Sequence, residues 1–140
     1  MRTHSQHNGL CRVNQDTAFY DEFSYPNMHA DFQGILKNGL GLASETWKAF
    51  QKELGWKEQD LDRIFNHQVS TVHQEMVFRA LELDYSKGYS TVEYLGNVGS
   101  CSLPISMAIG AENGALHSGD KVMMMAAGSG LACIMLGLEW

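Results

Sequence analysis

The chain has 140 residues, of which 44% are hydrophobic and 19% are charged, a composition typical of a single globular domain with its own core. Its 10 Lys and Arg residues against 16 Asp and Glu give a net charge of −6 without a basic cluster, which argues against a nucleic-acid partner. The apolar runs are strand-sized and the first 13 residues hold no apolar signal core, so we expect a soluble, cytoplasmic protein without a membrane span.

The three cysteines form no CxxC pair, so the sequence predicts neither a disulfide framework nor a metal site. The histidines do not change this interpretation. His67 and His73 are six residues apart, which would place them on different faces of a helix, and His4 with His7 lies in a terminus that we expect to be frayed.

The first 40 residues are poorly patterned, whereas residues 41–140 have the pattern of an α/β core. Residues 8–13 and 17–23 have the composition of short strands, but glycines interrupt any sustained period. Ser44 is the predicted N-cap of an amphipathic helix, and Gly55 is the predicted end of that helix. We expect all 140 residues to form one domain.

Strands and helices alternate after residue 60. Residues 61–65 predict a strand, and apolar residues at spacings of three and four over residues 69–83 predict a helix behind it. Residues 89–94 are β-branched and aromatic and predict the next strand. The following helix should have Ser102 as its cap and Pro104 in its first turn, and should end near residues 113–114.

The last 20 residues predict an antiparallel hairpin. Its strands cover residues 121–127 and 131–140, and the connection at residues 128–130 contains two glycines. The methionines at 123–125 lie inside the first strand and favour a core position over a binding surface. The predicted fold class is therefore α/β, a layered mixed sheet with helices packed on it.

Three polar segments each follow a predicted strand: residues 66–68, 96–99 and 128–130. Ligands usually bind where the strands of an open α/β sheet end, so we expect the three segments to converge there. Taken alone, His67 is more often a structural histidine, and Asn97, flanked by glycine, is more often a turn residue. Only the combination of the three segments indicates a site.

These residues resemble a known pattern when they are taken in order. The pattern is His67-Gln68, Gly96-Asn97, Ser102-x-Pro104 and Gly128-Ser129-Gly130. Over residues 60–140 it resembles the C-terminal half of the β-ketoacyl-(acyl-carrier-protein) synthase III group in the thiolase superfamily. Residues 47–56 look more like the branch that condenses long acyl-coenzyme A thioesters head to head.

The resemblance implies a Cys-His-Asn site and a Claisen condensation of acyl thioesters, an acyltransferase reaction of fatty-acid or related lipid biosynthesis. His67 and Asn97 match the histidine and asparagine that hydrogen-bond the thioester carbonyl as it becomes an enolate. Neutral imidazole and amide groups suit this role, because they hold an oxyanion without burying a full counter-charge. The two residues are therefore the predicted catalytic pair.

Other positions are implied by the same resemblance. Ser129 and Gly130 match the glycine-rich run that gives a backbone N–H to the oxyanion hole, and Gln68 and Ser70 are the expected substrate-binding residues. Val72 stands where the family's initiating enzymes carry an arginine that docks acyl carrier protein. This departure argues against a carrier-protein partner and favours acyl-coenzyme A as the donor.

The family's nucleophilic cysteine lies on an N-terminal half that has no match here, and none of Cys11, Cys101 and Cys133 occupies its position. Cys101 has no general base spaced to activate it, so we expect it to pack structurally, and we expect Cys133 to be a buried strand residue. The isolated chain should therefore be inactive, with the N-terminal half of the same enzyme as its partner and no cofactor besides the acyl substrates. It should self-associate through the apolar surface that this half would cover.

Two alternatives remain open. The first is a non-catalytic acyl-thioester-binding or assembly module of the same fold. The second is a self-sufficient hydrolase that uses Cys101. Binding of acyl-coenzyme A among the three polar segments favours the enzyme over the module. Iodoacetamide labelling of Cys101 no faster than that of a free thiol counts against the hydrolase.

Overall fold

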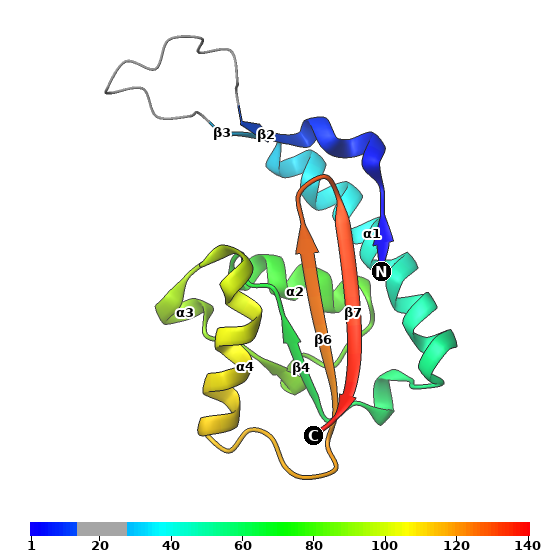
Figure 1. Cartoon of the computed structure of the whole chain (residues 1–140), viewed down its shortest axis with the longest axis vertical. Coiled ribbons are helices and arrows are strands. Elements are labelled where there is room, and N and C mark those ends of the chain that lie inside the picture. The colour runs from blue at the N-terminus through cyan, green and yellow to red at the C-terminus, as the bar shows by residue number, and fades with distance from the viewer. Residues whose placement is uncertain (14–27) are drawn as a thin grey trace.

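A mixed five-stranded sheet is the centre of the molecule in the computed structural model, which describes residues 1–13 and 28–140 (Figure 1). The strands follow the order β1 (Arg2–Thr3), β7 (Ala132–Glu139), β6 (Lys121–Gly128), β4 (Arg63–Asn66) and β5 (Gly88–Tyr89). β4 pairs in parallel with β6 and β5, whereas β7 pairs antiparallel with β6 and β1. β2 (Cys11–Val13) and β3 (Met28–Ala30) form a separate antiparallel pair.

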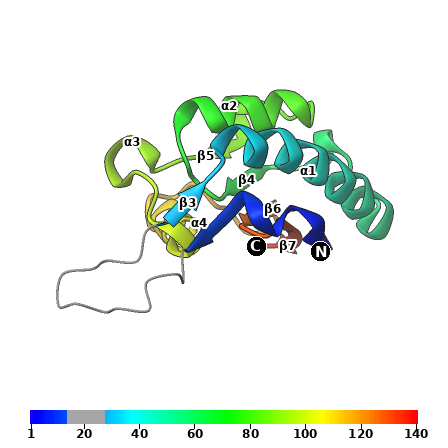
Figure 2. The same ribbon diagram turned by 90° about the horizontal axis from the view of Figure 1, so that it is seen from above.

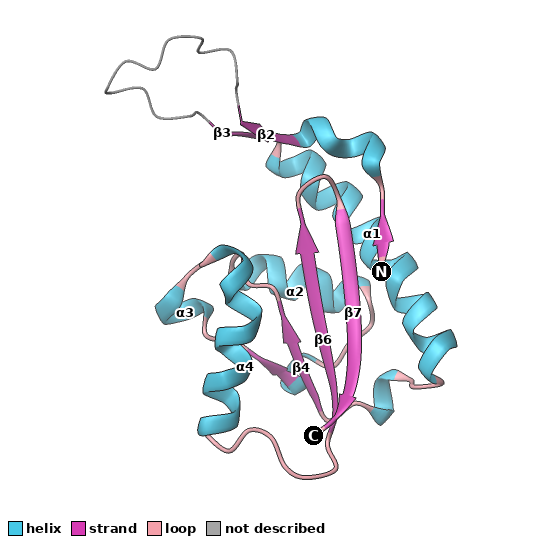
Figure 3. Cartoon of the chain, viewed as in Figure 1, coloured by secondary structure: helices cyan, strands magenta, loops and turns pink. Residues whose placement is uncertain are grey.

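Helices cover both faces of the sheet. α1 (Phe32–Leu54) and α2 (Thr71–Ala80) lie on one face, and α4 (Ser102–Glu112) lies on the other (Figure 2). The short α3 (Val92–Leu95) precedes α4 (Figure 3). Short 3₁₀ helices lie among these elements at Ser5–Leu10, Glu58–Asp60, Tyr85–Lys87 and Gly99–Cys101. Over the residues that the structure describes, no helix is long and apolar enough to cross a membrane.

Alternation along the central strands divides the core between the two faces. Ile64 and Met123 are buried with residues of α1 and α2, whereas their neighbours Phe65 and Val122 are buried on the side of α4. Successive side chains of a strand point to opposite faces, so each strand serves both cores. The predicted α/β class with helices layered on a mixed sheet is confirmed.

α1 begins thirteen residues earlier than the sequence predicted. Asp31 caps the helix, because its side chain accepts a hydrogen bond from the N–H of Gly34 at 2.9 Å, while Ser44 lies in mid-helix. The predicted start was wrong because Gly34 and Gly39 were interpreted as breaks, whereas a helix that packs on a sheet tolerates the low helix propensity of glycine. The predicted end is confirmed: Gly55 has φ of 70° and donates its N–H to Gln51 O.

α2 forms where the pattern predicted a helix, but it buries a different face. Val72 and Met76, which the apolar spacing placed inside, are 63% and 39% exposed. The buried face consists of Gln74, Val77 and Phe78. Gly88 of β5 explains the difference, because a Cβ there would lie 2.9 Å from the Phe78 ring and 3.1 Å from Gln74 Nε2. The missing side chain leaves room for these two residues.

Two local predictions were wrong near the polar segments. The strand predicted at residues 89–94 ends at Tyr89, and the chain then turns into α3. Ser102 is the first residue of α4 and is buried, so it does not cap the helix from outside. The helix end near residue 113 and the hairpin of β6 and β7 are confirmed.

The N-terminal predictions were met only in part. Residues 8–13 include a strand only at Cys11–Val13, and the strand expected at residues 17–23 lies outside the described residues. The terminus is not frayed, because the N–H of His4 donates to Leu131 O at 2.9 Å and its Nε2 lies 3.1 Å from Glu45 Oε2. β1 therefore closes one edge of the sheet.

Small residues let α4 approach the sheet. The residues of α4 that are buried are Ser102, Ser106 and Gly110, spaced four apart on one face. A Cβ at Gly110 would lie 2.8 Å from Phe65 Cε1 and 3.4 Å from Tyr89 Cδ1. The separation between α4 and β4 thus depends on the absence of a side chain at this position.

The substitution Gly110→Ala should therefore lower the free energy of unfolding by about 1–3 kcal/mol, since overpacking forces the Phe65 ring out of place. Gly41→Ala in α1 is the matched control, because a Cβ there meets nothing within 4 Å. It should raise the free energy of unfolding by about 0.5–1 kcal/mol through helix propensity. Urea denaturation followed by circular dichroism measures the free energy of unfolding of both variants. An unchanged free energy of unfolding in Gly110→Ala would contradict this packing.

Candidate functional site

The parallel strands β4 and β6 end at the same edge of the sheet, and two of the three polar segments lie there. His67 follows β4 directly, and its backbone N–H donates to Met125 O of β6 at 2.8 Å. Gly128 ends β6 at that edge, and residues 129–131 connect β6 to β7. The expected convergence is found for these two segments.

His67 is half-buried, and its surroundings favour the neutral ring. Burial lowers the pKa of His67 from its ordinary value of 6.5, and a hydrogen bond with the backbone of Gly99 raises the pKa in part. Gly99 belongs to the third polar segment, so this contact brings residues 96–99 to the same site. A neutral imidazole has one N–H donor and one acceptor nitrogen.

Asn97 lies in an exposed loop that is folded around Gly99. Its Oδ1 accepts the N–H of Gly99 at 3.0 Å, and Gly96 and Gly99 have φ of 64° and 62°, which only glycine adopts without strain. With its oxygen engaged, the Asn97 amide has two N–H donors to offer. Asn97 is not among the pocket-lining residues described below, and it meets His67 through the Gly99 backbone.

The predicted substrate-binding residues make contacts within the fold. Gln68 is buried, and its Oε1 accepts hydrogen bonds from Thr91 N at 3.2 Å and Thr91 Oγ1 at 3.0 Å. This ties the segment after β4 to the start of α3. Ser70 caps α2 by accepting the N–H of His73 at 3.1 Å. Their role in substrate binding stays a prediction.

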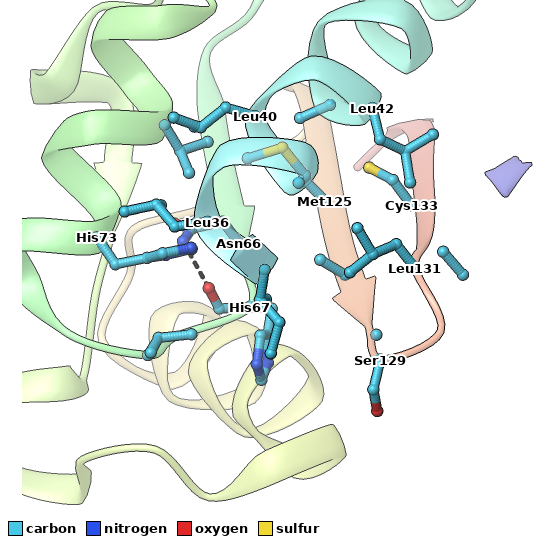
Figure 4. A pocket seen from close by; sticks show the side chains of 18 residues that line it. Leu36, Leu40, Leu42, Asn66, His67, His73, Met125, Ser129, Leu131 and Cys133 are labelled. Atoms are coloured by element: carbon cyan, nitrogen blue, oxygen red, sulfur yellow. Dashed lines mark hydrogen bonds between the residues drawn. The ribbon is translucent and has the colours of Figure 1, made fainter. Parts of the chain in front are cut away.

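A pocket of about 170 Å³ opens beside His67 (Figure 4). His67 and Ser129 contribute to its lining, and Gly130, with φ of 104°, lies next in the hairpin connection. Most of the wall is apolar, and it includes Leu36, Leu40, Val77, Met125 and Leu131. The site thus combines a histidine, a hairpin tip and an apolar cavity.

His73 and Asn66 also line this pocket, and neither was predicted as a site residue. The expectation that His67 and His73 lie on different faces of one helix was wrong, because His67 precedes α2 and both rings line the same cavity. Burial lowers the pKa of His73, and repulsion from His67 lowers it further. The sequence signal that could have identified Asn66 is its position as a polar residue at the end of an apolar strand.

The cysteines differ in their surroundings. Cys133 is buried in β7, as expected, and burial raises the pKa of its thiol. Cys101 directly precedes α4 and is exposed, so the expectation that it packs structurally was wrong. Cys11 is half-buried. Among the described residues, no three His, Cys, Asp or Glu side chains are grouped as metal ligands.

Comparison with known proteins gives a consistent set of matches. A family model for the C-terminal part of 3-oxoacyl-[acyl-carrier-protein (ACP)] synthase III matches residues 51–140. An acyl-CoA:acyl-CoA alkyltransferase from Shewanella oneidensis is 36% identical over 138 residues, which are 96% of this chain and 38% of that protein. A β-ketoacyl-[acyl-carrier-protein] synthase III from Clostridium beijerinckii is 28% identical over 127 residues, which are 89% of this chain and 39% of that protein.

Solved structures agree with these matches. The 3-oxoacyl-(acyl carrier protein) synthase III from Xanthomonas oryzae superposes with a TM-score of 0.87 at 32% identity, over 99% of this chain and 38% of that one. OleA from Xanthomonas campestris with bound cerulenin gives the same TM-score, identity and coverage. The chain thus spans 38% of the length of these proteins.

The two pocket histidines predict a pH-dependent stability. Because folding lowers the pKa of His67 and of His73, the unfolded chain binds more protons below pH 6.5, and the free energy of unfolding should fall as the pH drops from about 7.5 to about 5.5. His73→Leu should show a smaller decrease in urea denaturation. His117→Leu, at an exposed position, is the control and should keep the full decrease. An equal decrease in His73→Leu and the wild type would contradict the effect of burial.

Proposed function

Since the chain belongs to the C-terminal family of 3-oxoacyl-[acyl-carrier-protein] synthase III, we propose that it supplies the histidine and asparagine of a site for Claisen condensation of acyl thioesters. The solved relatives confirm the predicted thiolase-like half. One observation carries the proposal. His67, half-buried at the end of β4, shares the Gly99 backbone with Asn97 and lies in the wall of an apolar pocket.

The proposed reaction joins two acyl thioesters. One acyl group is held on a cysteine from a part of the protein outside this family match. The second thioester becomes an enolate when its α-carbon loses a proton to a base or loses a carboxyl group as carbon dioxide. A carbon–carbon bond forms between the enolate carbon and the cysteine-bound carbonyl carbon, the carbon–sulfur bond breaks, and the cysteine leaves as a thiolate. His67 and Asn97 stabilise the enolate oxygen by donating hydrogen bonds to it.

The electrostatics of the site favour this role. Burial lowers the pKa of His67, so the ring is mainly neutral at pH 7 and adds no full charge. Its single N–H can donate either to the Gly99 backbone or to a substrate. The enolate oxygen carries charge and is the stronger acceptor, since hydrogen bonds to ionised groups are about twice as strong as neutral ones.

The other predicted site residues have defined places in this proposal. Ser129 and Gly130, at the tip of the hairpin, supply a backbone N–H to the oxyanion hole of the cysteine-bound acyl group. Gln68 holds Thr91, and so positions the α3 segment that leads to Asn97. Ser70 fixes the start of α2 beside the pocket.

Exposed apolar residues favour a protein partner on the α4 side. On α3, α4 and the loop between them, Tyr94, Leu95, Val98 and Ile105 are 64%, 36%, 39% and 37% exposed. We propose that residues 1–140 form a C-terminal unit whose partner is the N-terminal half of the same enzyme. The unit alone would then lack condensing activity and self-associate through this surface.

The proposed substrates are acyl-coenzyme A thioesters, and no further cofactor is needed. Val72 stands where the resemblance implies an arginine for acyl carrier protein, and it is 63% exposed. Val72 therefore offers no positive charge to an acidic acyl carrier protein. This supports acyl-coenzyme A as the donor.

A hybrid enzyme tests the roles of His67 and Asn97. This chain replaces the matching 38% of the Shewanella oneidensis protein, and release of coenzyme A from acyl-coenzyme A is followed with a thiol reagent. The hybrid should release thiol, and His67→Ala and Asn97→Asp should each lower the rate by about 10²–10³-fold, the usual effect of losing one oxyanion donor.

His117→Ala is the matched control, because His117 is exposed, and it should leave the rate unchanged. Full activity in either site variant would show that the assigned roles are wrong. A hybrid that binds acyl-coenzyme A without releasing thiol would favour the non-catalytic binding module.

A further inference from the structure

The apolar pocket contains a buried acceptor without a partner. Asn66 is 2% exposed and lines the pocket, and its Oδ1 has no hydrogen-bond partner. Its Nδ2 donates to His67 O at 2.8 Å, which fixes the orientation of the amide (Figure 4). The free oxygen therefore cannot be exchanged for the nitrogen by rotation of the amide without loss of this bond.

A second polar atom lies in the same wall. His73 Nδ1 is buried without a partner, and His73 is drawn next to Asn66 in Figure 4. Burial and the neighbouring His67 lower the pKa of His73, which favours the neutral ring. In a neutral imidazole Nδ1 donates in one tautomer and accepts in the other.

We propose that Asn66 Oδ1 and His73 Nδ1 bind a hydroxyl group on the acyl chain, so that the pocket prefers a 3-hydroxyacyl chain to an unsubstituted one. This inference rests on the proposed function, which places an acyl thioester beside His67. Asn66 and His67 line the same pocket, so the hydroxyl lies near the thioester end of the acyl chain.

The chemistry of the two atoms selects a hydroxyl over other substituents. Asn66 Oδ1 accepts only, so it needs a donor, which a keto oxygen and a methylene group both lack. A hydroxyl donates to Asn66 Oδ1 and can also accept from His73. Sites with buried polar groups discriminate strongly against ligands that leave those groups unpaired.

The size of the cavity argues against a single water as its natural occupant. The volume of about 170 Å³ is well above the roughly 30 Å³ that one water takes up in the liquid. Apolar side chains from α1, β6 and β7 form most of the remaining wall. A chain with one hydroxyl matches this arrangement of one polar wall in an apolar cavity.

The test compares binding of decanoyl-coenzyme A and 3-hydroxydecanoyl-coenzyme A to the whole 140-residue chain by calorimetry. The two probes differ only in the hydroxyl group, so the ratio of their affinities isolates its contribution. The wild type should bind the hydroxylated probe about tenfold more tightly. His73→Leu should lose most of this preference, while the matched change His117→Leu, at an exposed histidine, should keep it.

Nitrogen NMR of the wild type gives an independent readout that requires no variant to fold. The hydroxylated probe should shift the His73 Nδ1 signal, and the unsubstituted probe should leave it nearly unchanged. Equal affinities for the two probes would overturn the hydroxyl inference and leave the proposed function intact. If neither probe binds, the acyl pocket is contradicted together with the inference.

Discussion

The parallel pairing of β4 with β6 determines where every other part of the site lies. The pair is fixed at one end by Asp62, whose N–H donates to Lys121 O at 2.9 Å and whose Oδ2 accepts the N–H of Lys121 at 2.8 Å. It is fixed at the other end by the bond from His67 N to Met125 O at 2.8 Å. A shift of one residue would exchange the two faces of β4, so Ile64 and Phe65 would swap cores and His67 would leave the pocket.

Short polar contacts after β4 then join segments that are far apart in the sequence. The Gly99 backbone contacts both His67 and Asn97, and Gln68 holds Thr91. Each contact is modest alone, since a net hydrogen bond contributes about 0.5–1.5 kcal/mol. Together they place neutral donors beside an apolar cavity. Burial, without any charged partner, lowers the pKa of the histidine, and the proposed role beside a developing oxyanion requires such a neutral ring.

The sequence predicted well those parts whose signal is local. The hairpin of β6 and β7, the strand before His67 and the end of α1 at Gly55 all follow from neighbouring residues. The start of α1 depends on a capping bond from Asp31 across glycines, and the buried face of α2 depends on the missing side chain at Gly88. The cap at Asp31 is a local signal that the glycines obscured, and only the effect of Gly88 is tertiary.

The sequence predicted a catalytic pair, whose role stays a prediction, but it did not predict the pocket. His67 and Asn97 were singled out by the resemblance of the polar segments to a known family, whereas the cavity wall combines α1, α2, β6 and β7 and forms only in the folded chain. His73 was misplaced because helix geometry was applied to His67, which lies before α2.

Amide hydrogen exchange at His67 tests the central claim most directly, namely that β4 and β6 stay paired up to the histidine. The account predicts that the His67 N–H is protected as strongly as that of Phe65 in the middle of β4, so that both exchange only on global unfolding. Exchange of the His67 N–H at the rate of an exposed loop, with Phe65 still protected, would show that the bond to Met125 O is absent. It would then contradict the placement of the site.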